Sequence, residues 1–500
     1  MRRLSNILLS AVLLGGGLAG CYDDKGNYDY KDINEMTFKI VPEAENGNYR
    51  YKQPPMDTLR VTYTPEIEQS RMEDESNLEY LWQVGYVKDN KNVIDSVRTK
   101  ELMLKFPPKE TTAYKVRFQV TDISTNISFY KELNMSTVYP YTNSWLVLNG
   151  MKGDHRISAI ENPDSTEYIF TKDAYMDLGY KRRFQDAEDL IYGANIYNNN
   201  LAPEFLQVIW SDSLVGMTPF EMKEVMSYAD LPKVVTDNKT KLAYGVDGGP
   251  AGPTILVDEN KQFYYAMVKT QGKYEIPKVS KEVGSYRLDK MAKSQESMAM
   301  CFWDDDRKQF LNFEFGGEIK LYSDKSNEWK DMEVVWMGTD NKDDKSRIGV
   351  ALMLDQKTGE YWTYHLPANS ADEIIGENIG ELPLDKDSRF ATMIEFEDQF
   401  FYTVGSKLYH FYVASKESFE LYDAGGTISQ LQFRIHEHHS VGDNVNHMKY
   451  CLGMVVNTET EGELHEVVLT NAGDVEKERV FTGFGPIQDI CFTFLNRIEL

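Results

Sequence analysis

The chain has 500 residues, of which 41% are hydrophobic and 12% aromatic, so it is neither a disordered chain nor one small domain. Its formal net charge is −25 at pH 7, and an acidic surface of this kind repels nucleic acid. We therefore expect a protein of two or more globular domains that does not bind nucleic acid.

The first 21 residues have the pattern of a secretory signal. Two arginines precede an apolar run over residues 7–18, which is too short and too rich in glycine to span a bilayer as a helix. The run ends in Leu-Ala-Gly-Cys at residues 18–21, which matches the lipobox of bacterial lipoproteins. We expect residues 1–20 to be a cleaved signal peptide and Cys21 to carry acyl chains, since several chains anchor a protein stably in a membrane.

Acidic residues follow the lipobox directly. Asp23 and Asp24 resemble the surface-export signal of lipoproteins of Bacteroidetes, and this resemblance implies a place on the outer membrane, facing the cell exterior. Alternatively, the two aspartates only solvate a flexible tether. Residues 21–34 are polar and rich in tyrosine, and we interpret them as that tether.

Alternating apolar and polar residues predict strands in the next hundred residues. Leu78, Tyr80, Trp82 and Val84 alternate with mostly polar neighbours, and the same period of two recurs over residues 114–120. A period of two with one polar face indicates a half-buried antiparallel sheet. We therefore predict an Ig/PKD-like β-sandwich over residues 35–140, with Trp82 at the centre of its core.

Several short motifs in this part of the chain resemble a known family. They are the run CYDDKGNY at 21–28, YKDIN at 30–34, Trp82 on its strand, the strand end Val-Thr-Asp at 120–122, and Ser-Trp-Leu-Val-Leu at 144–148. Together they resemble the PKD-like family lipoproteins of Bacteroidetes. The resemblance implies an accessory lipoprotein of a SusC/SusD-type locus, which encodes a nutrient importer, and it transfers no catalytic residue.

From residue 141 onward, short apolar strands alternate with polar turns. The turns at Asp258, Asp304, Asp355 and Glu397 are 46, 51 and 42 residues apart. Strand meanders that recur with a period in the forties are typical of a β-propeller. We therefore predict an all-β chain in which a β-propeller-like domain of about seven blades over residues 141–500 follows the sandwich. A second and third sandwich remain the alternative.

No motif predicts catalysis, a cofactor or a metal site. The densest titratable cluster, His436-Glu437-His438-His439, lacks the HExxH spacing of zinc proteases, and most such clusters are solvated loops. The acidic runs at 304–306 and 340–344 are interpreted as polar turns between strands. Three cysteines besides Cys21 lie in apolar stretches and are expected as buried thiols, with a Cys451–Cys491 bridge as the alternative.

Aromatic residues near predicted turns are the candidate binding site. Exposed rings beside carboxylates and amides form platforms for sugars or peptides, whereas propeller blades also use such rings for packing. The speculative ligand-binding set is Trp303, Trp329, Trp336, Tyr361, Trp362 and Tyr364.

These observations favour a non-catalytic cell-surface lipoprotein. It would be held in the outer membrane by its lipid anchor and would bind a glycan or peptide ligand, or a partner, as an accessory component of a SusC/SusD-type porter complex. Two alternatives remain open. One is a propeller glycoside hydrolase, which needs two carboxylates at a set separation. The other is a structural or adhesive surface protein.

Overall fold

The computed structural model describes most of the chain from residue 33 to residue 493. The residues outside the description are 1–32, 45–46, 54–56, 73, 109–111, 164–167, 182–183, 194–204, 247–252, 268–269, 271, 294–298, 315, 323–325, 341–346, 394–395, 435–449 and 494–500. The chain divides into two compact units. The first contains Met1–Tyr51 and Thr58–Val138, and the second contains Lys52–Asp57 and Tyr139–Leu500.

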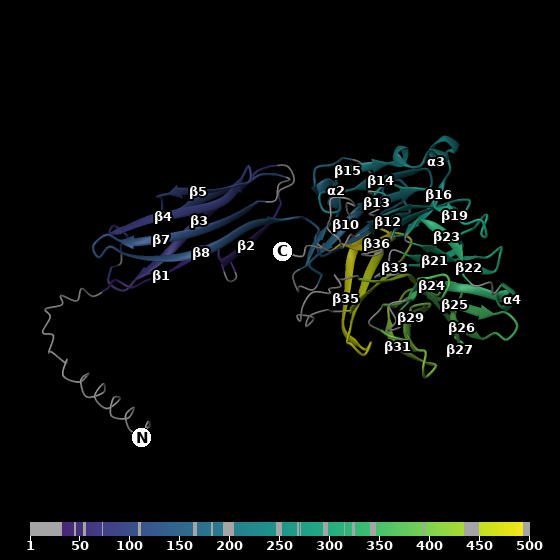
Figure 1. Ribbon diagram of the computed structural model, residues 1–500. Helices are drawn as coiled ribbons and strands as arrows, with labels where there is room; N and C mark the ends of the chain where they lie inside the picture. The colour runs from purple at the N-terminus through teal and green to yellow at the C-terminus, as the bar shows by residue number, and fades with distance from the viewer. Residues whose placement is uncertain are drawn as a thin grey trace, which may run out of the picture. The chain divides into compact units, whose positions relative to one another are not determined.

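The first unit is a β-sandwich of two antiparallel sheets (Figure 1). The smaller sheet has the order β1 (Met36–Val41), β3 (Leu59–Gln69) and β6 (Leu102–Phe106). The larger has the order β2 (Asn48–Lys52), β8 (Ile127–Val138), β7 (Ala113–Asp122), β4 (Leu78–Lys88) and β5 (Lys91–Val97).

Trp82 is the central core residue of this sandwich, as predicted. Its side chain is fully buried, and its ring packs on Phe118 with 4.4 Å between ring centroids. The indole Nε1 donates a hydrogen bond to the carbonyl oxygen of Thr99 at 3.1 Å. The buried indole therefore satisfies its donor, which removes the penalty of placing a polar atom in an apolar core.

The described residues of the second unit form seven sheets that follow one another along the chain. The first three consist of β36 (Ile487–Thr493), β9 (Ser144–Asn149), β10 (Arg156–Glu161) and β11 (Ile169–Thr171); β12 (Asp189–Gly193), β13 (Phe205–Trp210), β14 (Ser213–Met217) and β15 (Glu224–Ser227); and β16 (Leu242–Val246), β17 (Thr254–Asp258) and β18 (Phe263–Ala266).

The other four sheets continue this order. They consist of β20 (Lys290–Lys293), β21 (Met300–Asp304), β22 (Gln309–Glu314) and β23 (Glu318–Leu321), with β19 (Lys278–Val279) at the edge; β24 (Met332–Thr339), β25 (Arg347–Asp355), β26 (Tyr361–Pro367) and β27 (Ile375–Gly380); β28 (Phe390–Ala391), β29 (Gln399–Val404), β30 (Lys407–Tyr412) and β31 (Glu417–Asp423); and β32 (Ile428–Phe433), β33 (Tyr450–Asn457), β34 (Gly462–Leu469) and β35 (Val475–Phe484).

The last strand closes these sheets into a ring. β36 pairs with β9 in antiparallel register, from Ile487 opposite Asn149 to Thr493 opposite Ser144, and Figure 1 shows the yellow C-terminal strands beside the blue β10. First strands of successive sheets also contact one another, as β12 does with β36 and β16. The predicted all-β fold, a sandwich followed by a propeller-like domain, is therefore confirmed.

Side-chain hydrogen bonds tie these first strands together. The carboxylate of Asp489 on β36 accepts from the Leu190 backbone N–H on β12 at 2.8 Å, and Asp189 on β12 accepts from the Gly245 N–H on β16 at 3.0 Å. Burial raises the pKa of Asp189 to about 6. Backbone donors at the inner edges of these sheets are thereby satisfied from the neighbouring blade.

A buried charged network also joins the last blade to the closing strands. Glu466 on β34 is fully buried, and its Oε2 accepts from Trp145 Nε1 on β9 at 2.7 Å and from Arg434 at 3.3 Å. Its Oε1 accepts from Arg479 on β35. The Arg434 guanidinium lies 4.6 Å from the centroid of the Phe492 ring on β36. The Glu466 carboxylate therefore pairs with two guanidinium groups of its own blade and accepts a hydrogen bond from β9 across the closure of the ring.

Aspartates cap the tight turns between second and third strands. Asp258 ends β17 and accepts from the backbone N–H groups of Asn260 and Gln262, both within 2.9 Å. Asp304 ends β21 and Asp355 ends β25, and both accept backbone N–H groups in the same way. The predicted turn at Glu397 differs, because it joins a first strand to a second. The equivalent hairpin of that blade is at residues 405–406.

The connections within each blade differ in length. Second and third strands are joined by tight hairpins such as residues 211–212 and 405–406. First and second strands are joined by longer segments, of which residues 194–204 and 434–449 are the longest. Because each blade is an antiparallel meander in a closed ring, the connections between first and second strands all leave from one face, here called the long-connection face, whereas the tight hairpins and the links between blades, such as residues 172–188 and 228–241, leave from the other. No helix among the described residues is long and apolar enough to cross a membrane.

Candidate functional site

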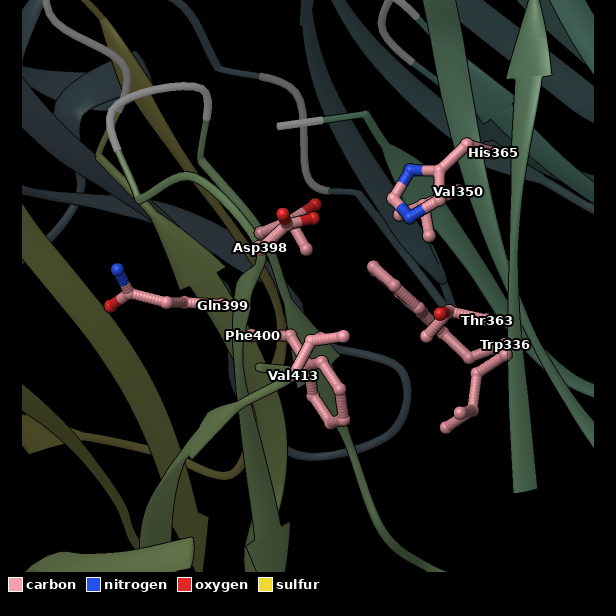
Figure 2. A pocket seen from close by; sticks show the side chains of 10 residues that line it. Trp336, Val350, Thr363, His365, Asp398, Gln399, Phe400 and Val413 are labelled. Carbon is pink, nitrogen blue, oxygen red and sulfur yellow. The ribbon is translucent and has the colours of Figure 1, made fainter. Parts of the chain in front are cut away.

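A cavity lies between the blade β24–β27 and the blade β28–β31. The space between the side chains totals about 330 Å³ with its open part included, and its enclosed part holds no more than about one water molecule. Figure 2 shows side chains from both blades facing each other across it. Its lining consists of Trp336, Val350, Leu352, Thr363, His365, Thr392, Asp398, Gln399, Phe400 and Val413.

The cavity lies toward the long-connection face of the ring. His365 is opposite Val350 near the start of β25, and Asp398 comes directly before β29. Thr392 follows the end of β28 and donates a hydrogen bond to the Thr339 carbonyl oxygen at 2.7 Å, which joins the ends of two first strands. Side chains of the cavity wall are thus positioned by strand ends, which are more rigid than loops.

His365 is the central polar residue of the wall. It is 2% exposed, and its Nδ1 lies 3.1 Å from both carboxylate oxygens of the buried Asp340. Because Nδ1–H is donated to a carboxylate, the neutral ring presents Nε2 as an acceptor. Nε2 is buried, lines the cavity through its ring and has no partner among the described residues. A buried acceptor without a partner is costly, so this atom marks a place for a donor.

Thr363, two residues earlier on the same strand, also has a buried polar side-chain atom. Its side chain is 2% exposed, and its Oγ1 has no hydrogen-bond partner within the described part of the chain. Residues two apart on a strand share a face, so Tyr361, Thr363 and His365 all face the next blade. The remaining wall is apolar and includes Leu352 and Phe400.

The predicted aromatic set is divided among three environments. Trp303 and Trp329 are fully buried in one core cluster, with 6.1 Å between their ring centroids, so they pack the interior. Trp362 and Tyr364 are partly exposed and pack against that same cluster. Trp336 and Tyr361 are partly buried on the opposite face of the sheet, in the cluster next to the cavity. The six rings therefore form no single platform.

Trp336 is the one member of that set that lines the cavity. Its ring stacks on Phe390 of the next blade, with 5.7 Å between centroids and 29° between planes. The indole therefore holds two blades together and contributes to the wall at the same time. Sequence reasoning missed His365 and Thr363 and had interpreted Asp340 as part of a polar turn. The alternation of Tyr361, Thr363 and His365 was the signal that could have found them.

Other predicted features lie outside the described residues or are structural. Cys21 and the cluster at 436–439 are outside the described residues, and within those residues no group of three or more His, Cys, Asp or Glu could hold a metal. Cys301, Cys451 and Cys491 are buried thiols that form no disulfide bond among the described residues, as expected for packing thiols. The Cys451–Cys491 bridge considered from the sequence is therefore not formed.

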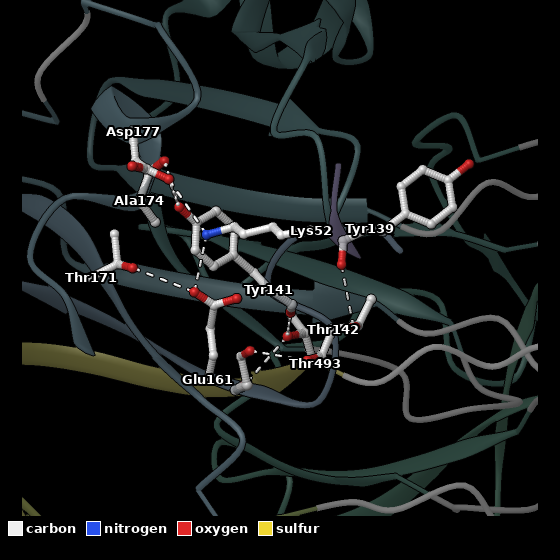
Figure 3. Close-up of polar contacts among 10 residues, drawn as sticks. Lys52, Tyr139, Tyr141, Thr142, Glu161, Thr171, Ala174, Asp177 and Thr493 are labelled. Carbon is white, nitrogen blue, oxygen red and sulfur yellow. Dashed lines mark hydrogen bonds and ion pairs between the residues drawn. The ribbon is translucent and has the colours of Figure 1, made fainter. Parts of the chain in front are cut away.

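A second polar cluster lies at the beginning of the propeller unit (Figure 3). Tyr141 is fully buried, and its hydroxyl donates to Asp177 at 2.7 Å. Lys52 forms ion pairs with Glu161 at 3.0 Å and with Asp177 at 3.5 Å, and its Nζ lies 4.2 Å from the Tyr141 ring centroid. Because every charged group here has a charged partner within the cluster, we interpret it as structural.

Comparison with solved structures found many distant similarities. The protein is similar to a quinonprotein alcohol dehydrogenase-like protein of Bacteroides thetaiotaomicron, with 12% identity, a TM-score of 0.39, and coverage of 90% of this chain and 97% of that chain. It is also similar to an auxiliary nutrient binding protein of the same species, with 9% identity, a TM-score of 0.29, and coverage of 80% and 88%. Similarities this distant carry no argument about activity.

Comparison by sequence gives a more specific result. The chain matches none of the curated proteins with which it was compared. Residues 21–181 match the model of the PKD-like family. The matched region begins at Cys21 and contains all the described strands of the sandwich. The N-terminal part of the chain therefore has the sequence pattern of the PKD-like family, as the motifs at residues 21–148 predicted.

Proposed function

We propose that the protein is a non-catalytic cell-surface lipoprotein whose propeller binds a ligand for an outer-membrane nutrient importer. The observation that carries this proposal is the cavity between blades β24–β27 and β28–β31. It is a small opening in which a few buried polar groups lie among apolar side chains, a mixture that small-molecule sites also have. It also lies toward the long-connection face, and binding residues are often carried on or beside loops that a rigid scaffold positions.

The sequence supports the place of action. The lipobox at residues 18–21 supports lipidation of Cys21, and the acidic pair that follows supports export to the outer surface of the outer membrane. The match to the PKD-like family begins at this same cysteine. The net charge of −25 suits a surface protein that must stay soluble at its tether and must not adsorb anionic polymers.

The glycoside hydrolase alternative is less well supported. Hydrolysis of a glycoside needs two carboxylates facing one another across the substrate. Asp398 is the single carboxylate among the described residues that line the cavity, and Asp340 is engaged with His365 behind the wall. The adhesive alternative predicts no concave aromatic-lined pocket, whereas Trp336 and Phe400 line the opening between these two blades.

Co-purification from membranes tests the proposal. A tagged full chain would be expressed in the bacterium that encodes it, extracted from the outer membrane with detergent and analysed by mass spectrometry. We expect a TonB-dependent porter and its lid lipoprotein to be recovered with it. The Cys21→Ser variant is the control, since it should lose acyl labelling and recover neither partner. Recovery of the wild-type protein alone would refute the importer role.

A further inference from the structure

We propose that the edge strand β5 of the sandwich pairs with β5 of a second copy of this chain. The two copies form one continuous antiparallel sheet about a two-fold axis at Ile94. This inference is independent of the ligand and of the importer role. It follows from the free backbone groups of β5, from the apolar side chains beside it and from its charges.

The strand β5 lies at the edge of the five-stranded sheet, where its single neighbour in the described sheet is β4 (Figure 1). All seven residues of β5 pair with β4 without a bulge. The turn at residues 89–90 has positive φ at both positions, as in the common two-residue hairpin, so its closing pair, Lys88 with Lys91, is hydrogen-bonded. Hydrogen-bonded and non-hydrogen-bonded pairs alternate along the rest of the ladder.

Three residues of β5 consequently have unpaired backbone groups. The N–H and C=O groups of Asn92, Ile94 and Ser96 point away from β4, and they have no partner in the described part of the chain. A two-fold axis at Ile94 places Ile94 opposite its own copy and Asn92 opposite Ser96 of the second copy. This antiparallel register pairs all the free groups of both strands, whereas a shift in either direction leaves some of them unpaired.

Exposed apolar side chains lie along the same edge. Ile94 is 70% exposed and Val87 is 68% exposed, the largest fractions among the large apolar side chains that the structure describes. Ile94 is opposite Gly85, and Val87 is two residues from Gly85, so both side chains lie on one face of the sheet. Pairing brings the two Ile94 side chains together beside Val87 of each copy, and removal of this apolar surface from water stabilises the contact.

The charges of the strand are complementary in this register. Lys91 lies diagonal to Asp95 of the second copy, about 7–8 Å away, a separation that a long side chain spans, and the symmetry repeats the contact. The sandwich as a whole carries little net charge: residues 33–138 contain 14 Lys and Arg and 16 Asp and Glu, whereas residues 139–500 contain 36 and 59. Repulsion between copies is therefore weakest at the sandwich.

Disulfide trapping of the full chain in detergent tests the register. In Ile94→Cys the two new thiols face each other across a hydrogen-bonded pair, where Cα atoms are about 5.5 Å apart, a distance that suits a disulfide. We expect a covalent dimer after mild oxidation. Asn92→Cys and Ser96→Cys are the matched controls, since each new thiol lies roughly 14 Å from its own copy and should not cross-link alone. A mixture of these two variants, with different tags, should give the mixed dimer.

Sedimentation velocity of the same chain measures the association without a cross-link. One pair of short strands buries less than a standard interface, so we expect a reversible dimer with a Kd in the micromolar range or above. Ile94→Lys places two like charges directly opposite each other and should weaken association at least tenfold. Ile375→Lys is the control, because Ile375 is also exposed but lies on a propeller strand, and it should leave association unchanged.

Three results would overturn the proposal. The first is Ile94→Cys that gives no more covalent dimer than Asn92→Cys alone or than the wild-type chain with its three buried cysteines. The second is a chain that stays monomeric at every concentration, and the third is association that Ile94→Lys does not weaken. Ile94 is exposed, so both of its variants are expected to fold, and circular dichroism checks this. Co-purification of the porter tests the importer role separately, whichever result is obtained here.

Discussion

The buried Glu466 network gives the strongest prediction about stability. Glu466→Gln keeps the size and shape of the side chain but removes the carboxylate charge that Arg434 and Arg479 share. Arg434 is fully buried and the Arg479 side chain is 8% exposed, so water screens little of the remaining positive charge. Removing one partner of a buried ion pair costs about 3–5 kcal/mol.

This free energy converts into a measurable shift in melting temperature. Unfolding entropy is about 2.1 cal/mol/K per residue, which gives roughly 0.76 kcal/mol/K for the roughly 360 residues from Tyr139 onward. The substitution should therefore lower the Tm of the propeller by roughly 4–7 °C. Differential scanning calorimetry measures this shift.

A matched substitution at the surface provides the control. Glu420 pairs with Lys407 at 2.6 Å, but both side chains are more than 40% exposed. An exposed pair contributes at most about 1 kcal/mol, so Glu420→Gln should lower the Tm by less than about 1.5 °C. If Glu466→Gln melts no lower than this control, the reasoning that the network holds the closing blade together is wrong.

Three other predictions concern pH, backbone conformation and thiols. Burial lowers the pKa of His410 to about 4, so the native ring binds fewer protons than the unfolded chain between about pH 6.5 and 4, and stability should fall as pH drops through this window. Between pH 7.5 and 5, His410 should lower the free energy of unfolding of the wild-type protein by about 2 kcal/mol. His410→Phe retains the stacking on Phe401 and should lose that much less stability over the same pH range, as measured by urea denaturation. An unchanged pH dependence would contradict this. Gly150→Ala should cost about 3 kcal/mol or more, because φ is +133° and the new Cβ would lie 2.4 Å from the Asp154 carbonyl oxygen. Gly153→Ala in the same hairpin should cost only about 1–2 kcal/mol, since φ is +85° but nothing lies within 4 Å, and equal costs would refute the steric argument. The thiols of Cys301, Cys451 and Cys491 should react with a thiol reagent only after unfolding, and rapid reaction in the native protein would contradict their burial.

Local patterns were sufficient to predict the fold class. The period of two around Trp82 predicted the sandwich, and the spacing of Asp258, Asp304 and Asp355 predicted the repeating blades. These aspartates recur because each caps the same tight turn by accepting backbone N–H groups. The turn at Glu397 was wrongly taken as equivalent to these three turns, because polar residues also occupy the connection between the first and second strands of a blade.

Features that depend on distant residues could not be predicted in this way. The pairing of Ile487–Thr493 with Ser144–Asn149 closes the ring, but nothing in either segment specifies the other. The shared burial of Trp303 and Trp329 likewise depends on packing between neighbouring blades. A tryptophan near a turn is compatible both with an exposed binding platform and with a buried core, so residue type alone does not distinguish the two.

The cavity shows how a polar residue inside a propeller can be misread. In a two-layer sandwich, Thr363 and His365 would mark the solvent side of a half-buried strand. In a ring of blades both faces of each sheet are covered by neighbours, so the same alternation places these side chains in the interior. The partner of His365, Asp340, lies outside β26, so their contact is visible only in the folded chain.

Growth of a deletion strain on complex nutrients tests the proposed importer role most directly. The gene would be removed from the bacterium that encodes it, and growth would be measured on a panel of complex glycans and peptides, with the wild-type gene restored as the control. We predict slower growth on at least one of these nutrients, recovered on restoration of the gene. Unchanged growth on every nutrient of the panel would contradict a role in nutrient uptake.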